Sequence, residues 1–320
     1  MSQAPVQHPR HGIHTIDTGF HRPQFDAAYL LVEEGRGAFI DCGTAHSVPN
    51  LLRAIDAAGL TPAQIDWLIL THVHLDHAGG AGALLHHLPN ARCVVHPRGA
   101  PHMIDPTRLI AGATAVYGEA EMARSYGTIV PIPQVRVDIA AEGHVVDLAG
   151  RELVCLDTPG HALHHLCVWD ARSRSFFAGD TFGISYRELD GPDGIFIFPT
   201  TTPVQFDPPA LKASIRRLVS WQPEAIHITH FGRITTPQRH AETLIEWIDA
   251  MVECALACTD TPQRHAALVA ALDDLFVPRA VAHTGMSPDA VRKIIDMDIE
   301  LNAQGLGVCL DRRQRATARQ

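Results

Sequence analysis

The chain has 320 residues, of which 46% are hydrophobic and 19% are charged, an ordinary composition for a globular protein with a large core. Its formal net charge of -9 disfavours nucleic acid as the main partner, because phosphate binding usually needs a basic face. There is no run of about 20 apolar residues, so we expect no membrane span and no membrane partner. The first residues lack the apolar core of a signal peptide, which makes a cytoplasmic location the expectation.

The chain begins as an alternation of strands and helices. Two apolar runs, residues 28–32 and 38–41, flank a turn that contains glycine, and this pattern predicts a β-hairpin. Apolar spacing then predicts, in chain order, a helix over 48–58, a strand over 66–71, a helix over 80–87 and a strand over 93–96. Residues 97–133 mix short apolar helical stretches with aromatic residues, and we interpret them as a helical insertion over the functional site.

The second half of the chain continues this alternation and then becomes helical. Strands are predicted over 145–148, 152–157, 166–169, 175–178 and 225–228, with a helix over 208–219 before the last of them. From Thr236 onward the pattern is helical, and the basic segment from Asp311 is expected to fray. We therefore predict an α/β protein with a main domain over 1–235 and a helical C-terminal segment over 236–320.

The densest group of metal-capable side chains follows the strand predicted over 66–71. The run Thr71-His72-Val73-His74-Leu75-Asp76-His77 holds three histidines and an aspartate, which are usual ligands of zinc. Residues two apart share a face of an extended segment, so His72, His74 and Asp76 are expected to point the same way. His77 breaks this period, which requires the chain to turn there. Two sets of ligands that diverge from one loop are what a two-metal site needs.

Three later strands also end at a histidine or aspartate beside a small residue. The segments are Thr158-Pro159-Gly160-His161, Gly179-Asp180 and Thr229-His230. Proline and glycine end a strand and turn the chain, which leaves the ligand at the strand end. His227 lies three residues before His230, so in an extended strand the two side chains should point to opposite faces. His230, at the strand end, is the better ligand candidate. The seven cysteines are scattered, and we expect them to be reduced and mostly buried.

Together these motifs resemble the metallo-β-lactamase-fold hydrolase superfamily, in particular its glyoxalase II and lactonase-like branch, over roughly residues 12–235. The resemblance implies an αββα sandwich of two mixed β-sheets flanked by helices. It implies two divalent metal ions, with zinc as the first choice and iron or manganese as alternatives. In the implied site, one ion is held by His72, His74 and His161, the other by Asp76, His77 and His230, and Asp180 bridges both.

The same resemblance implies a reaction. A hydroxide that bridges two metal ions about 3.5–4 Å apart attacks the substrate, and the ions stabilise the charge that develops. Asp76 and Asp180 are the catalytic carboxylates, with Asp76 placed to orient the nucleophile or to pass on its proton. Asp41 and Thr71 are expected to support the ligand histidines through their second ring nitrogens. His165 is interpreted as a further support, with a buried packing histidine as the alternative.

The substrate is predicted from weaker signals. Hydrolysis of a carboxylic ester, lactone or thioester of a small molecule is the first choice, because the segments expected to form the pocket are apolar. The residues proposed for that pocket are Tyr117, Phe182, Tyr186, Phe196 and Phe198, and the alternative is that they belong to the core or to an interface. The C-terminal helices are expected either to cover the site or to form a homodimer interface.

Other members of the superfamily give the alternatives. Lactonase relatives often carry a tyrosine three residues after the bridging aspartate, where this chain has Gly183. The same metal site would also serve a phosphodiesterase or nuclease, although the acidic chain shows no basic stretch for RNA. The remaining alternative is an oxidoreductase that resembles the mono-iron persulfide dioxygenases. One iron ion and oxygen uptake would identify it.

Overall fold

The computed structural model describes residues 10–201 and 205–317. Its strands form two mixed sheets of six strands each. The first sheet has the strand order β1-β2-β3-β4-β5-β6, in which the first three strands pair antiparallel and β3 to β6 pair in parallel. Its strands are β1 (Ile13–Asp17), β2 (Ala27–Glu33), β3 (Arg36–Ile40), β4 (Ile65–Ile69), β5 (Arg92–Val95) and β6 (Val137–Ile139).

The second sheet has the order β12-β11-β10-β9-β8-β7. Strands β7 and β8 pair antiparallel, β10 and β11 in parallel, and β11 and β12 antiparallel. Its strands are β7 (Val145–Leu148), β8 (Arg151–Asp157), β9 (Leu166–Asp170), β10 (Ser175–Phe177), β11 (Ala225–Ile228) and β12 (Gly232–Thr235). By its contacts the chain divides into two compact units, the first with residues 1–155 and 169–173, and the second with residues 156–168 and 174–320.

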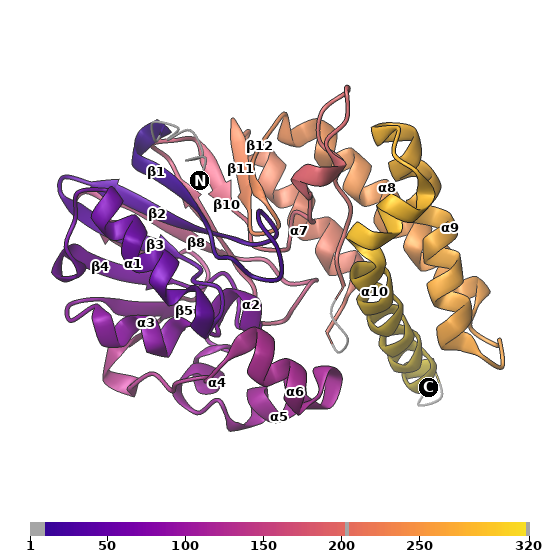
Figure 1. Ribbon diagram of the computed structural model, residues 1–320, viewed down its shortest axis with the longest axis horizontal. Coiled ribbons are helices and arrows are strands. Elements are labelled where there is room, and N and C mark those ends of the chain that lie inside the picture. The colour runs from indigo at the N-terminus through magenta and orange to yellow at the C-terminus, as the bar shows by residue number, and fades with distance from the viewer. Residues whose placement is uncertain (1–9, 202–204, 318–320) are drawn as a thin grey trace. The chain divides into compact units, whose positions relative to one another are not determined.

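Helices α1 and α3 cover one face of the first sheet in the first unit (Figure 1). Leu51 and Ile55 of α1 and Leu84 of α3 are fully buried against strand residues such as Leu68. This periodic apolar face is what drives an amphipathic helix onto a sheet. The helices of the unit are α1 (Val48–Ala57), α2 (Leu75–Ala78), α3 (Ala81–His87), α4 (Ala100–Ile104), α5 (Thr107–Tyr117) and α6 (Glu119–Glu121), followed by a π-helical turn (Met122–Tyr126).

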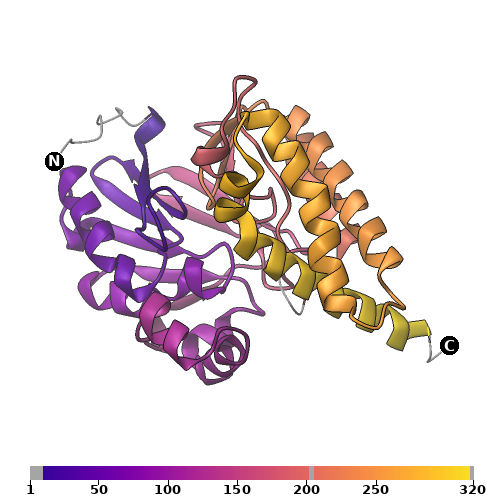
Figure 2. The same ribbon diagram turned by 45° about the vertical axis from the view of Figure 1, so that its right-hand side comes forward.

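The second unit contains the long C-terminal helices. They are α7 (Pro208–Ser220), α8 (Pro237–Ala257), α9 (Arg264–Thr284) and α10 (Pro288–Thr317), and Figure 2 shows α8, α9 and α10 packed against one another. Helix α7 begins where the carboxylate of Asp207 accepts a hydrogen bond from the backbone N–H of Ala210 at 3.1 Å. Phe276 of α9 is fully buried and packs on Trp247 of α8, with ring centroids 4.9 Å apart. None of the helices in the described ranges is long and apolar enough to cross a membrane.

The predicted order of elements holds with three differences. Strands β1, β6 and β12 were not predicted; each is an edge strand whose polar residues interrupt the apolar pattern. The expectation that Asp76 continues an extended ligand segment is wrong, because Leu75–Ala78 forms the short helix α2 directly after His74. Helix α10 continues to Thr317, so the segment from Asp311 that was expected to fray is helical that far. The predicted boundary between residues 235 and 236 stays a prediction.

Candidate metal centre

The first unit holds four of the predicted ligands at the end of β4. His72 and His74 lie in the extended segment after the strand, and Asp76 and His77 lie on the first turn of α2. His72 and His77 are fully buried, whereas the carboxylate of Asp76 is 24% exposed. A short helix thus turns Asp76 and His77 away from the extended period of the two preceding histidines.

Asp41, at the end of β3, is the buried anchor of this ligand loop. Its carboxylate accepts three hydrogen bonds: from the backbone N–H of Thr71 at 2.8 Å, from the hydroxyl of Thr71 at 2.7 Å, and from Nδ1 of His77 at 3.0 Å. A carboxylate only accepts, so Nδ1 of His77 carries the proton and Nε2 presents a lone pair. That Nε2 lies 3.8 Å from the carboxylate oxygen Oδ2 of Asp76.

Thr71 orients His72 through a hydrogen bond with Nδ1 of its ring, as Asp41 does for His77. Because its hydroxyl hydrogen is donated to Asp41, the oxygen of Thr71 acts as acceptor for Nδ1 of His72 at 3.2 Å. The lone pair of His72 is therefore on Nε2, which lies 2.7 Å from Nδ1 of His74. At this separation Nδ1 of His74 donates a hydrogen bond to Nε2 of His72. A divalent cation bound by both rings would take the place of the donated proton.

The second unit holds the other three predicted ligands. His161 follows β8, Asp180 follows β10, and His230 lies between β11 and β12. All three are buried, with Asp180 and His230 only 6% and 5% exposed. The Asp180 carboxylate lies between the two histidines, with Oδ2 3.4 Å from Nε2 of His161 and Oδ1 3.8 Å from Nε2 of His230.

His161 is oriented by a backbone carbonyl. Its Nδ1 donates to the carbonyl oxygen of Thr200 at 3.2 Å, which leaves the lone pair on Nε2, the atom that faces Asp180. His227 was expected to point away from His230, and its ring stacks on that of Phe177 at a centroid distance of 4.7 Å. His227 is therefore a packing residue of the β10–β11 pair.

His165 is a fully buried histidine that holds Asp180. Its Nε2 accepts from the backbone N–H of Asp180 at 3.3 Å, so Nδ1 must carry the proton of the neutral ring. Nδ1 lies 3.0 Å from the hydroxyl of Thr158 and 3.1 Å from that of Thr181. With both ring nitrogens engaged, His165 supports Asp180 and is not a ligand itself.

The donor atoms fit a divalent cation. Nε2 of a neutral His161 and the carboxylate oxygen of Asp180 are both acceptors, and they face each other at 3.4 Å. Two such lone pairs repel each other unless a cation lies between them. Ligand atoms about 2.0–2.1 Å from a tetrahedral zinc ion lie about 3.3 Å apart, which is close to this separation. Imidazole and carboxylate donors also accept iron or manganese.

Four of the five residues predicted for a substrate pocket lie inside the second unit. Phe182, Tyr186 and Phe198 are fully buried, and Phe196 is 7% exposed. Phe198 packs on Phe276 with ring centroids 5.3 Å apart. These contacts favour the alternative that the aromatic residues belong to the core, and the pocket assignment stays a prediction. Tyr117 of α5, in the first unit, is 37% exposed, and its ring lies 5.6 Å from that of Tyr126.

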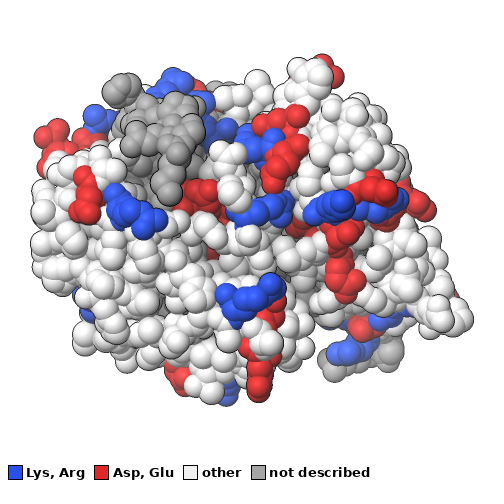
Figure 3. All heavy atoms as spheres, viewed as in Figure 1, with Lys and Arg blue, Asp and Glu red and all other residues white. Residues whose placement is uncertain are grey.

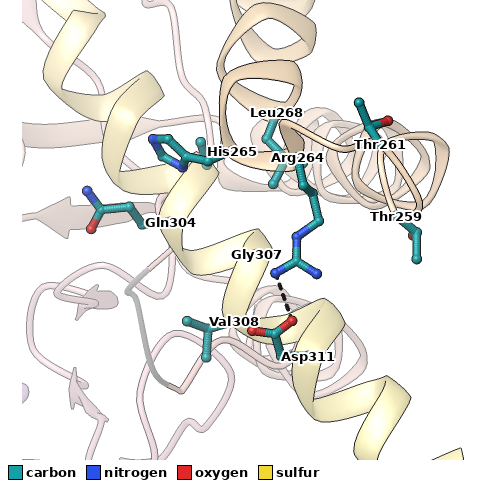
Figure 4. A pocket seen from close by; sticks show the side chains of 10 residues that line it. Thr259, Thr261, Arg264, His265, Leu268, Gln304, Gly307, Val308 and Asp311 are labelled. Carbon is teal, nitrogen blue, oxygen red and sulfur yellow. Dashed lines mark hydrogen bonds and ion pairs between the residues drawn. The ribbon is translucent and has the colours of Figure 1, made fainter.

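A separate cavity of about 560 Å³ lies among the C-terminal helices, lined by residues of α9, α10 and the loop before α9. In Figure 4 the side chains of Arg264 and Asp311 point toward each other across it, and they form an ion pair at 2.7 Å. None of the predicted ligands or pocket residues is among the residues that line it.

Sequence reasoning assigned no role to several residues that contact the ligands. Thr158 and Thr181, which lie beside predicted ligands in the sequence and hydrogen-bond His165, were not singled out as supports, and neither was Thr200, which contacts His161 from 39 residues away. A hydroxyl residue beside a ligand is the signal that would have suggested the first two. The contact from Thr200 uses its backbone carbonyl, which no sequence pattern reveals.

Comparison with known proteins places the chain in a family. The model of the Metallo-beta-lactamase superfamily matches residues 22–230, well over half of the chain. A metallo-beta-lactamase fold-containing protein of Sulfurisphaera tokodaii is 28% identical over 233 residues, which are 71% of this chain and 81% of that protein. A hydroxyacylglutathione hydrolase of Salmonella typhi is 30% identical over 162 residues, which are 50% of this chain and 49% of that protein. An acyl-coenzyme A thioesterase of Gallus gallus is 29% identical over 187 residues, which are 53% of this chain and 62% of that protein.

Solved structures show the same fold. The crystal structure of an archaeal metallo-beta-lactamase superfamily protein from Sulfolobus tokodaii has a TM-score of 0.66 at 23% identity, and the match covers 93% of this chain and 99% of that chain. A metallo-beta-lactamase family protein from Thermus thermophilus has a TM-score of 0.68 at 20% identity and matches 95% and 94% of the two chains. The predicted αββα sandwich with a helical C-terminal segment is thereby confirmed. With its family model matched over residues 22–230 and His and Asp side chains suited to divalent metal, the chain belongs to the metallo-beta-lactamase superfamily.

Proposed function

We propose that this protein is a metal-dependent hydrolase that cleaves a carboxylic ester, lactone or thioester of a small molecule. The observation that carries the proposal is the tautomer of three buried histidines. His72, His77 and His161 each donate from Nδ1 to an oxygen acceptor, so in the neutral form each ring presents the lone pair of Nε2. Ligand histidines in metal sites are held in this way.

The proposed ligand sets are those that the sequence motifs implied. One ion would be held by His72, His74 and His161, the other by Asp76, His77 and His230, and Asp180 would contact both. Two bound divalent ions supply a water of lowered pKa and a Lewis acid for the substrate carbonyl. Asp76, whose carboxylate is the more exposed one, would orient the attacking water and carry its proton toward the leaving group.

Thioesters are the first substrates to test. Two of the relatives are, by name, a hydroxyacylglutathione hydrolase and an acyl-coenzyme A thioesterase. The match covers only 49% and 62% of those proteins, so their activities come to this chain as a proposal. On the face seen in Figure 3, basic and acidic side chains are interspersed, which favours a small substrate over a nucleic acid.

The experiment combines metal analysis with a substrate panel. The purified protein is assayed against an acylglutathione, an acyl-coenzyme A, an aryl ester, a lactone and bis(p-nitrophenyl) phosphate, before and after chelation. We expect two divalent ions per chain, and hydrolysis of a carbonyl substrate that chelation abolishes and added zinc, manganese or iron restores. Full activity after exhaustive chelation contradicts the proposal. Faster cleavage of the phosphodiester, or one iron with oxygen uptake, would replace it with one of the alternatives.

A further inference from the structure

Helix α10 carries two buried polar side chains one turn apart. Asp298 is 6% exposed and Asn302 is fully buried. Residues four apart lie on one face of a helix, so both reach the same neighbouring segment. That segment is the loop over residues 185–201, which follows Asp180. Burying such groups costs free energy unless they are hydrogen-bonded, so their partners indicate what the helix holds in place.

Asn302 fixes the backbone on both sides of Thr200. Its Oδ1 accepts from the backbone N–H of Thr201 at 2.7 Å, and its Nδ2 donates to the carbonyl oxygen of Pro199 at 3.4 Å. The hydroxyl of Thr201 donates in turn to the backbone carbonyl of Asn302 at 3.3 Å. Between these fixed residues, the carbonyl of Thr200 accepts from Nδ1 of His161. The orientation of His161 therefore depends on α10 through one intervening residue.

Asp298 reaches a second ligand through Tyr186. Its Oδ1 accepts from the Tyr186 hydroxyl at 2.9 Å, and the tyrosine is only 1% exposed. The Tyr186 ring meets the ring of His230 edge-on, with centroids 6.4 Å apart and an interplanar angle of 80°. The backbone beside His230 is tied to the same loop, because the N–H of Phe231 donates to the carbonyl of Ser185 at 3.1 Å.

We propose that α10 positions the metal ligands of the second unit. Asn302, acting through Thr200, sets the direction of the His161 lone pair, and Asp298, acting through Tyr186, sets the ring plane of His230. The inference rests on the proposed function, since it takes both histidines as ligands. It gives the C-terminal helix a role toward the site that does not require a second copy of the chain.

The test compares Asn302→Leu with a control on the same helix. Asn302→Leu keeps the branched shape and the number of heavy atoms, and it removes both side-chain hydrogen bonds. Arg292→Gln instead removes the ion pair between α10 and Asp273 of α9, in which Nε and Nη2 lie 2.8 Å from the two carboxylate oxygens. The readouts are zinc affinity by competition with a chelator, the visible spectrum of the cobalt-substituted protein, and the thermal midpoint of the metal-free protein. Tyr186→Phe, which keeps the ring, serves as a milder second variant.

We expect Asn302→Leu to weaken the binding of one of two zinc ions by about tenfold and to alter the cobalt spectrum, since loss of an outer partner costs about 10–100-fold. Asn302→Asp, which keeps the acceptor for Thr201, should recover the spectrum. Arg292→Gln should lower only the thermal midpoint. Equal zinc affinity in Asn302→Leu and wild type, or equal losses in Asn302→Leu and Arg292→Gln, overturns the inference.

If Asn302→Leu does not fold, the cobalt spectrum of Tyr186→Phe tests the inference instead. A shifted spectrum supports the inference, and a spectrum identical to wild type overturns it. Failure of the wild-type protein to bind any metal is a different result. It would contradict the proposed function itself, and the inference with it.

Discussion

Asp41 and His77 form a buried pair in which the carboxylate oxygen Oδ2 accepts from the imidazole Nδ1 at 3.0 Å. Asp41 adopts a left-handed backbone conformation, with φ 55°, which aspartate and asparagine tolerate better than most residues. The strand β3 therefore ends with its carboxylate turned toward the ligand loop, where it also holds Thr71.

Asp41→Asn should weaken metal binding without unfolding the protein. Asparagine tolerates the backbone conformation but lacks the charge that favours a proton on Nδ1 of His77. We expect metal affinity or turnover to fall by about 10–100-fold, as for other outer partners of ligand histidines. Competition with a chelator measures the affinity. An affinity equal to that of wild type would show that Asp41 does not support the ligand.

Asp180→Ala should remove bound metal and abolish turnover. Its carboxylate faces both His161 and His230, so its loss should cost more than the roughly 100-fold of an outer partner. Elemental analysis and the thioester assay measure the two effects. His86→Ala, which changes an exposed histidine in the last turn of α3, is the matched control and should behave as wild type. Two tightly bound ions in Asp180→Ala would refute the ligand assignment.

Asp170→Asn should destabilise the first unit at neutral pH. Asp170 is fully buried and accepts from Nε and Nη2 of Arg151 at 3.1 and 2.5 Å. Removing one partner of a buried pair costs about 3–5 kcal/mol, and Glu33, whose Oε2 lies 3.7 Å from Nη1 of Arg151, should offset part of this loss. Denaturant unfolding measures the loss. Asp66→Asn, which breaks a more exposed pair with Arg36, should cost about 1 kcal/mol or less. Equal losses in the two variants would contradict the prediction.

The effect of Asp170→Asn should also depend on pH. Burial raises the pKa of Asp170, but hydrogen bonds from Arg151 and Ser173 outweigh it, and the pKa lies below the ordinary value. The unfolded chain has a pKa of about 3.9 at such a residue, so the stabilisation is complete above that pH and is lost as the pH falls through the folded-state pKa. The unfolding free energies of wild type and Asp170→Asn should therefore converge as the pH falls below about 4. A constant difference down to about pH 2 would show that the charge of Asp170 is not the cause.

Gly160→Ala should disturb the loop that carries His161. Gly160 has φ 135°, and an added Cβ would lie 2.2 Å from the backbone nitrogen of Leu211 at the start of α7. Strain and overpacking of this kind cost about 1–3 kcal/mol each. Gly194→Ala is the control, because Gly194 has φ 109° but an added Cβ would meet nothing within 4 Å. The difference in thermal midpoint and metal affinity between Gly160→Ala and Gly194→Ala measures the effect of the clash with Leu211. Equal values in the two variants would contradict the prediction.

The sequence determined the family and most of the elements. Apolar periodicity marks β4 and α1 because burial of one face acts over a few residues. The ligands are recognisable for a similar reason. The run from His72 to His77 and the segments ending at His161 and Asp180 each lie a few residues after a buried strand, so they are local patterns. The strand β12 lies at the edge of its sheet with Arg233 and Thr235 exposed, so no continuous apolar run marks it in the sequence.

Only the tertiary structure decided how the side chains are oriented. The short helix α2, not an extended strand, presents Asp76 and His77, because the turn after His74 satisfies backbone groups of the loop. The tautomers of His77 and His161 depend on Asp41 and on the carbonyl of Thr200, which lie 36 and 39 residues away. Asn302 and Thr201 are 101 residues apart. Hydrogen bonds over such separations leave no periodic trace in a sequence, since they form only when packing brings distant segments together.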